Sequence, residues 1–150
     1  MNKNYALVTG GTAGIGLDIA HELASRGHNI LLTARREDRL KDIVQQLMSD
    51  YEVHADYIAA DLSEPEAPGI IFNFCDSRQY TVNILVNNAG YSINKKFHET
   101  GEDEEEKFLR VLGTSVVALT KRFIPVMLSQ QSGKIMLVSS LAAFAPPATG

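Results

Sequence analysis

The sequence has few of the cysteine and histidine residues that form disulfides or bind metals. Cys75 is the only cysteine in 150 residues, so no disulfide can form within the chain, and a reducing compartment fits. Cys75 falls on the apolar face of an expected helix, which indicates a core residue. The four histidines lack the spacing of metal ligands, and we expect no bound metal.

A strong excess of charge and long apolar runs are also lacking. The net charge of −4 gives no reason to expect nucleic acid or an anionic membrane as a partner. No apolar run approaches the length of a membrane span. The first expected strand begins so close to Met1 that no signal peptide fits before it. These absences predict a cytoplasmic protein without membrane or nucleic-acid partners.

The sequence does contain a regular alternation of two patterns. Short apolar runs predict buried strands at residues 5–9, 30–34, 53–60, 82–86 and 134–138. Apolar residues at helical spacing predict helices from about residue 15, over 37–48, from about residue 69, and over 102–128, where Pro125 is expected to kink or break the last helix. Such alternation is typical of parallel βαβ units wound to both sides of a sheet, so we expect an α/β fold. With 45% apolar residues, 150 residues suffice for one core, and residues 1–150 are assigned to one domain.

A glycine-rich turn directly follows the first strand and opens the first helix. Gly10 allows a tight turn, Gly14 lets phosphates approach the backbone, and Gly16 lets the helix pack closely on the strand. Free backbone N–H groups and the positive end of the helix dipole then face a pyrophosphate. The alternative is that the glycines merely end a strand. The expected contact residues are Thr9, Gly10, Gly11, Thr12, Gly14, Ile15 and Gly16.

Further landmarks come at the ends of three later strands. Asp61 follows the third strand, Asn87-Asn88-Ala89-Gly90 follows the fourth, and Ser139-Ser140 follows the fifth. Together with the T-G-x-x-x-G-x-G turn, this ordered set resembles the short-chain dehydrogenase/reductase family in its compact branch. The resemblance extends from Asn4 to the end of the sequence. It implies a Rossmann fold, a doubly wound parallel sheet with strand order 3-2-1-4-5.

The resemblance also implies roles at the adenosine end of a dinucleotide. Asp61 is expected to hydrogen-bond the adenine, with Leu62 beside the ring; the alternative for Asp61 is a helix N-cap or turn residue. Asn88, Ala89 and Gly90 are expected to border the adenine ribose while their segment holds the central sheet. The alternative there is a plain turn, because Asn and Gly favour turns.

The charge at the end of the second strand predicts which dinucleotide binds. An acid there would accept hydrogen bonds from a ribose 2′-hydroxyl, but Arg35 and Arg36 precede the first acid, Glu37. A guanidinium can hold a 2′-phosphate through paired N–H donors, so we expect NADP(H), with Arg35 as the main contact. The alternative is a solvated arginine pair at a helix start.

The family's chemistry is hydride transfer between nicotinamide and a carbonyl or alcohol carbon, with a Tyr as general acid/base, a neighbouring Lys, and a Ser that orients the substrate oxygen. Ser140 matches that serine; the alternative is a helix-capping serine. No Tyr or Lys follows Ser140 in this sequence. Tyr91 and Lys95 have the Y-x-x-x-K spacing, but they precede the serine and no helix start is visible there, so we do not expect them to be catalytic.

A relay Asn that many family members place in the long helix is also missing. An alignment without gaps puts Leu112 at that position, and a shifted one puts Ser115 there. A proton relay of the usual kind is therefore in doubt.

We accordingly expect the N-terminal part of a longer enzyme, or a truncated gene product, that ends before the later strands of the sheet. Residues 134–138 would then form an open, aggregation-prone edge. The complete protein would be an NADP(H)-dependent oxidoreductase of small carbonyl or alcohol substrates and a homo-oligomer, dimer or tetramer. The 150-residue chain itself would be inactive. Two alternatives remain: a non-catalytic NADP-binding or regulatory protein, and a structural subunit that pairs through its open edge.

Overall fold

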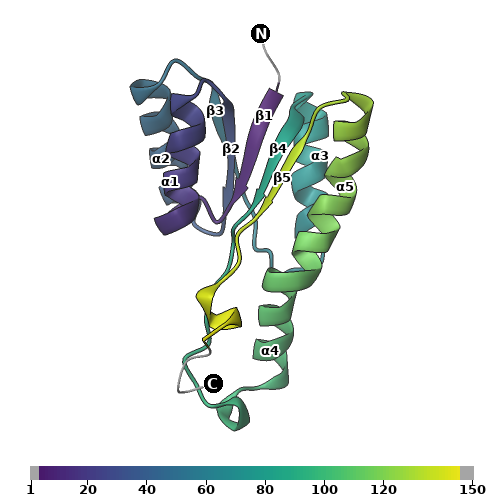
Figure 1. Cartoon of the computed structure of the whole chain (residues 1–150). Coiled ribbons are helices and arrows are strands. Elements are labelled where there is room, and N and C mark those ends of the chain that lie inside the picture. Colours follow the sequence, from purple (N-terminus) through teal and green to yellow (C-terminus); the bar gives the residue numbers. More distant parts are fainter. Residues whose placement is uncertain (1–3, 146–150) are drawn as a thin grey trace.

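The computed structural model describes residues 4–145, and in it five parallel strands form one sheet (Figure 1). The strand order is β3-β2-β1-β4-β5, as the sequence predicts. The strands are β1 (Asn4–Thr9), β2 (Asn29–Ala34), β3 (Ala55–Ala59), β4 (Thr81–Asn87) and β5 (Lys134–Leu137). The third strand is shorter than expected, because the chain turns into it only at Ala55.

Helices cover both faces of the sheet. Helices α1 (Gly14–Ser25) and α2 (Glu37–Asp50) lie on one face, and α3 (Ala67–Arg78) and α5 (Ser115–Ser129) lie on the other (Figure 1). Helix α3 starts earlier than expected, with Pro68 in its first turn, where a missing N–H costs no helical hydrogen bond.

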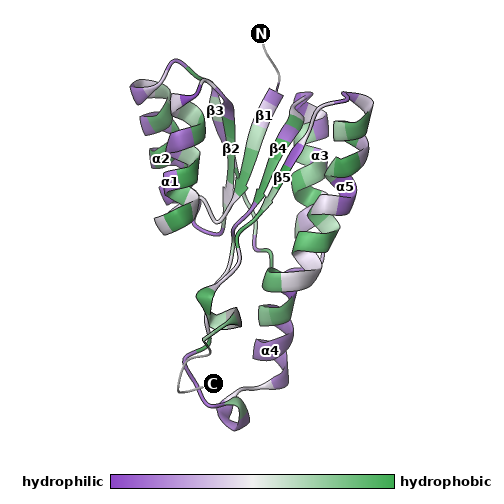
Figure 2. Ribbon diagram, in the orientation of Figure 1, coloured by the Kyte–Doolittle hydropathy of each residue, from purple (hydrophilic) through white to green (hydrophobic). Residues whose placement is uncertain are grey.

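Alternate residues of the central strands point into two separate apolar layers, one on each face of the sheet. Val8 and Leu32 pack with Leu40 of α2, whereas Leu7 and Leu31 pack in the layer that contains Phe123 of α5. Figure 2 shows mostly apolar strands between helices that carry both hydrophilic and apolar residues, and α5 also exposes the apolar side chains of Val117, Ile124 and Leu128. Parallel strands buried on both faces have this near-continuous apolar character.

The register brings the carboxyl ends of the strands to one edge of the sheet. Thr9 of β1 pairs with Thr33 of β2, and Ala34 pairs with Ala59 of β3. On the other side, Asn87 of β4 pairs with Leu137 of β5. Ligands of open α/β sheets bind outside this edge.

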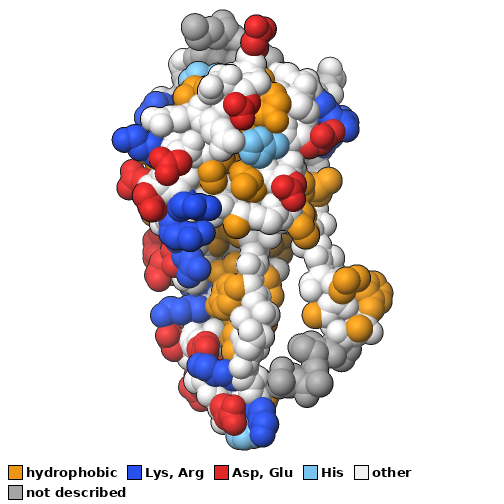
Figure 3. All heavy atoms as spheres, turned by 90° about the vertical axis from the view of Figure 1, so that its left-hand side faces the viewer, with side chains coloured by type: hydrophobic (Ala, Val, Ile, Leu, Met, Phe, Trp, Pro, Cys, Tyr) orange, Lys and Arg blue, Asp and Glu red, His pale blue; other side chains and the backbone are white. Residues whose placement is uncertain are grey.

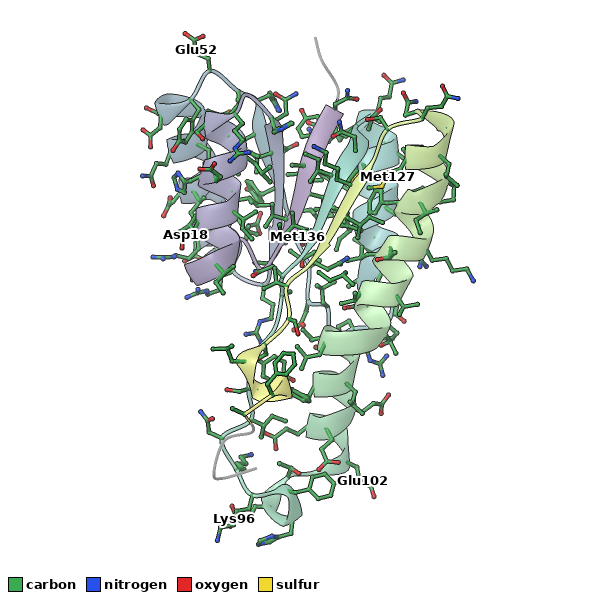
Figure 4. All side chains as sticks on the ribbon, in the orientation of Figure 1. Asp18, Glu52, Lys96, Glu102, Met127 and Met136 are labelled. Atoms are coloured by element: carbon green, nitrogen blue, oxygen red, sulfur yellow. The ribbon has the colours of Figure 1, made fainter. Side chains whose placement is uncertain are left out.

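The segment after β4 extends past that edge. It contains a short 3₁₀ helix, Phe97–Glu99, and helix α4 (Glu102–Leu109). Figure 4 shows Lys96 and Glu102 at the end of the molecule opposite Glu52, which lies in the loop between α2 and β3.

The predicted helix over residues 102–128 does not form as one regular α-helix. A π-helical turn, Arg110–Thr114, joins α4 to α5. Pro125 does not break the helix, which continues to Ser129. The proline sits in the last turn and a half, where few hydrogen bonds depend on it. Of the two outcomes predicted at Pro125, a kink or a break, the break does not occur.

The same helical run qualifies as a membrane span by length and composition alone. Glu102–Ser129 contains a window of mean hydropathy 1.5, of which 28% is buried, so the expectation that no run approaches a span is wrong for this segment. Leu119 and Phe123 of the run are buried in the core of the sheet. Core helices of globular proteins pass the same test, so the finding is weak evidence for a membrane.

Candidate functional site

A cavity of about 610 Å³ lies at the carboxyl edge of the sheet. Most of the residues expected at a nucleotide site line it: Gly10, Thr12, Ile15, Arg35, Arg36, Asp61, Leu62, Asn88, Ala89 and Gly90. Thr9, Gly11, Gly14, Gly16 and Ser140 are not among its lining residues. Its volume is in the range of small-molecule and cofactor pockets. Figure 3 shows the face below α1 and α2 as hollowed, with basic side chains along one edge and apolar side chains at the other.

The hydroxyl of Thr9 joins the loops that follow β1 and β4. Thr9 is buried, and its Oγ1 donates to the carbonyl of Val86 at 3.2 Å. The same oxygen accepts from the backbone N–H groups of Asn88 at 2.9 Å and Ala89 at 3.0 Å. One side chain thus fixes the start of the Asn88–Gly90 segment against the end of β1.

Asn88 and two glycines complete this junction. The Asn88 amide nitrogen donates to the carbonyls of Thr9 at 2.9 Å and Gly10 at 3.3 Å. A Cβ at Gly16 would overlap the Asn88 side chain and the Gly10 carbonyl. Gly10 has φ +68°, and a Cβ there would lie 2.8 Å from Cα of Ala89. The glycines therefore let the turn, the first helix and the β4 loop approach one another closely.

The first turn of α1 presents unpaired backbone donors beside the cavity. Gly14 has φ +53° and open space where a Cβ would be, and Ala13 before it makes no side-chain cap. No acidic residue lies in the first turn of α1. Free N–H groups and the positive dipole end suit an anion.

Arg35 and Arg36 lie exposed between β2 and α2 and line the cavity. Within residues 4–145, neither forms an ion pair. The nearest acid in sequence, Glu37, accepts a long hydrogen bond of 3.5 Å from the hydroxyl of Tyr57. Both guanidinium groups are thus available to an anionic ligand.

Asp61 forms a turn contact and also lines the cavity. Its Oδ1 accepts from the backbone N–H of Ser63 at 2.9 Å, as a turn residue does. The second carboxylate oxygen has no partner among the described residues, and Asp61 lines the cavity beside Leu62. The turn therefore fixes the carboxylate and leaves one oxygen for a ligand.

Asn87 braces the sheet. It is buried, its amide nitrogen donates to the hydroxyl of Thr120 at 3.3 Å, and its backbone carbonyl accepts from Val138 N–H at 2.9 Å. The first residue of the N-N-A-G tetrad thereby ties β4 to both α5 and the end of β5.

Ser140 is exposed and caps the 3₁₀ helix Leu141–Ala143. Its Oγ accepts from the backbone N–H of Ala142 at 3.1 Å. Tyr91 and Lys95 lie in an irregular segment, as the sequence predicts. Because no helix forms there, Tyr91 and Lys95 are not neighbours on one helix face. Lys95 instead forms an ion pair with Glu104 at 2.8 Å.

Of the two candidate relay positions, Leu112 lies next to the site. Its Cδ2 is 3.0 Å from where a Cβ would stand at Gly90. Ser115 is buried, and its hydroxyl donates to the carbonyl of Val111 at 2.9 Å. Neither residue presents a free polar group to the cavity.

The cavity also includes residues that the sequence analysis did not single out. They are Ala13, Thr33, Ala34, Ala60, Ser63, Glu64, Lys107 and Val111, and Tyr91, which the sequence analysis considered only as part of the Y-x-x-x-K pair, lines the cavity as well. Lys107 and Val111 come from the helical run after β4. The positions of both depend on the rotation of α4, which no local pattern reveals.

Other chemistry is sparse within residues 4–145. No group of three or more His, Cys, Asp or Glu side chains gathers there in a way that could hold a metal. Cys75 is buried, and burial raises the pKa of its thiol to about 12, which leaves it protonated and unreactive.

Comparison with known proteins agrees with this geometry. The family model for the short chain dehydrogenase matches residues 4–150. L-xylo-3-hexulose reductase of Hypocrea jecorina is 33% identical over 158 residues, covering 92% of this chain and 52% of the relative. "Inactive hydroxysteroid dehydrogenase-like protein 1" of Homo sapiens is 33% identical over 139 residues, covering 91% of this chain and 42% of the relative.

A solved structure of L-sorbose reductase from Gluconobacter frateurii, complexed with NADPH and L-sorbose, superposes with a TM-score of 0.91. It is 30% identical, and the match covers 97% of this chain and 55% of that chain. The chain spans about half the length of the curated relatives it matches.

Proposed function

Since the chain belongs to the short-chain dehydrogenase family, we propose that it carries the NADP(H)-binding part of an oxidoreductase. The reaction is hydride transfer between nicotinamide and the carbonyl or alcohol carbon of a small molecule. The catalytic Tyr and Lys lie beyond this stretch of sequence in the complete protein, and residues 1–150 are its incomplete NAD(P)-binding domain.

The observation that carries the proposal is the joint lining of one cavity by the glycine turn and two unpaired arginines. Gly10 and Thr12 face the same space as Arg35 and Arg36. A pyrophosphate and a 2′-phosphate are the two anionic parts of NADP(H), and these groups suit both. A charge-assisted hydrogen bond contributes about 1.5–3 kcal/mol net, or roughly ten- to a hundredfold in affinity.

Each part of the cavity would have a separate task. When bound, the cofactor supplies or accepts the hydride at its nicotinamide ring. The backbone N–H groups from Gly14 to Gly16 would hold the pyrophosphate, Arg35 the 2′-phosphate with Arg36 in support, and Asp61 the adenine. The Asn88–Gly90 segment would border the adenine ribose, and Ser140 would orient the substrate oxygen.

A binding titration tests this proposal. We expect the folded chain to bind NADPH at one site and to bind NADH about ten to a hundred times more weakly. Calorimetry with both cofactors, and with ATP as a control nucleotide, measures the difference. A folded chain that binds none of them, or that binds ATP as tightly as NADPH, would overturn the proposal.

A non-catalytic NADP-binding or regulatory protein is the second candidate. One comparison favours it: the human relative that is 33% identical over 139 residues is named an inactive hydroxysteroid dehydrogenase-like protein. We expect the 150-residue chain to bind NADPH without oxidising it in the presence of ketones or aldehydes. Turnover that is lost in Ser140→Ala would show that this chain is itself an enzyme. A structural subunit that pairs through β5 is a weaker third candidate.

Composition and family support a proposal for the location, partners and oligomeric state of the complete protein. The net charge of −4 and the buried single thiol support a cytoplasmic location without nucleic-acid or membrane partners. We infer a homo-oligomer, dimer or tetramer, for the complete protein.

A further inference from the structure

Lys107 brings a cation from α4 into the wall of the cavity. It lines the same space as Asp61 and Glu64, which follow β3. Its Nζ lies 2.8 Å from Oδ2 of Asp103, one helical turn earlier. The hydrogen bond to Asp103, with the nearby charges of Glu64 and Asp61, raises the pKa of Lys107, so the ammonium stays charged.

The surroundings of this ammonium differ from those of an ordinary helix-surface lysine. Asp61 offers one carboxylate oxygen without a partner among the described residues. Leu62 and Val111, both mostly buried, contribute apolar surface to the same cavity. A fixed acceptor, a tethered donor and aliphatic walls together suit a flat heterocycle with a donor and an acceptor on its edge.

We propose that Lys107 is a specificity-determining residue of the cofactor site and that, together with Asp61, it reads the polar edge of the adenine base. This inference rests on the proposed NADP(H) function. The adenine 6-amino group donates to the free oxygen of Asp61, and a ring nitrogen next to it accepts from Lys107. Hypoxanthine carries a 6-oxo group in place of the amine, so it sets an acceptor against the carboxylate.

The competing explanation is a plain ion pair between Lys107 and Asp103 on the helix surface. Both side chains are exposed, and such i,i+4 pairs contribute little to stability. A plain ion pair would not distinguish one base from another. The preference between two bases is therefore the decisive measurement.

The experiment compares NADPH with reduced nicotinamide hypoxanthine dinucleotide phosphate by binding titration on the full chain. We expect wild type to prefer NADPH at least tenfold. Lys107→Met should weaken NADPH binding three- to tenfold and reduce the preference by a similar factor. Lys107→Arg should retain most of both.

Two variants serve as controls. Asp103→Asn removes the ion pair but keeps the ammonium, and it should keep the base preference. Lys121→Met removes an exposed lysine of α5 outside the cavity and should change neither affinity. Circular dichroism of each variant verifies the fold.

The possible outcomes distinguish failure of this inference from failure of the proposed NADP(H) function on which it rests. If Lys107→Met weakened the binding of NADPH and of the hypoxanthine analogue equally, Lys107 would act only by general charge attraction, and the inference would be overturned. No change in either affinity would overturn it as well. Loss of the preference in Asp103→Asn to the same extent would assign the effect to the ion pair and overturn it too. Failure of folded wild type to bind NADPH would instead overturn the proposed function.

Discussion

Single residues at the strand ends hold the loops around the cavity in place. Thr9 satisfies two backbone N–H groups of the β4 loop with one buried oxygen, so the loop is positioned before any ligand arrives. Asp61 uses one oxygen for its turn and keeps the other free among the described residues. The structural and functional interpretations of such residues, which look like alternatives in a sequence, are compatible here because an oxygen or a side chain has more than one bonding position.

Arg35 carries the first prediction at this scale. In the proposed function Arg35 contacts the 2′-phosphate of NADPH, a group that NADH lacks, and Arg35→Ala removes that contact. We expect NADPH affinity to fall about ten- to a hundredfold, and NADH affinity to change less than threefold. Titrations with both cofactors measure the two effects.

Arg39→Ala is the matched control, because Arg39 is an exposed arginine of α2 outside the cavity lining. It should leave both affinities unchanged. Equal losses for NADPH and NADH in Arg35→Ala would show that Arg35 does not read the 2′-phosphate.

At the scale of elements, the π-helical turn decides what α4 presents to the cavity. A π turn is an α-helix with one inserted residue, and such turns occur often at functional sites. Here the turn Arg110–Thr114 contains the cavity residue Val111 and separates Lys107 of α4 from the core residues of α5. The sequence pattern over 102–128 continues at helical spacing, so the insertion is invisible to periodicity.

Deletion of Gly113 tests this role. It should restore a regular α-helix and rotate α4 by about 100° relative to α5, because each residue turns a helix by that angle. Lys107 and Val111 would then leave the cavity wall. We expect NADPH affinity to fall tenfold or more while the helix content measured by circular dichroism stays the same.

Gly113→Ala is the control for this deletion. Nothing lies within 4 Å of a Cβ at Gly113, so the alanine fits without displacing a neighbour. It should keep cofactor binding and stabilise the helix by about 0.5–1 kcal/mol. Unchanged NADPH affinity in the deletion variant would show that the π turn does not shape the cofactor site.

At the scale of the whole molecule, the sheet is closed on its faces but open at β5. This four-residue strand pairs with β4 alone among the described strands, and Met136 and Leu137 on it are half or more exposed. Figure 4 shows Met136 on β5 at this edge. Open, apolar strand edges pair with other chains.

We therefore expect the chain to associate as its concentration rises, and Met136→Lys to reduce that association, since a charged edge residue disfavours strand pairing. Sedimentation velocity over a range of concentrations measures it. Met48→Lys on α2, where the methionine is 42% exposed, is the control and should not change association. The same reduction in Met48→Lys would indicate general apolar adhesion, and no change in Met136→Lys would exclude the β5 edge.

The sequence alone determined the order of elements, the doubly wound sheet and the edge at which the cavity lies. Apolar runs and helical periodicity are local properties, and parallel strands end at a common edge, so residues such as Gly10, Asp61 and Asn88 could be expected to meet. The family resemblance added the strand order and the roles at the adenosine end.

Only the tertiary structure decided which other side chains reach that edge. The π turn, the place of Lys107 and Val111 in the cavity wall, the Thr9 junction and the position of Leu112 beside Gly90 all depend on how the elements pack against one another. That packing is set by contacts between residues far apart in the chain, and periodicity within one segment carries no information about it.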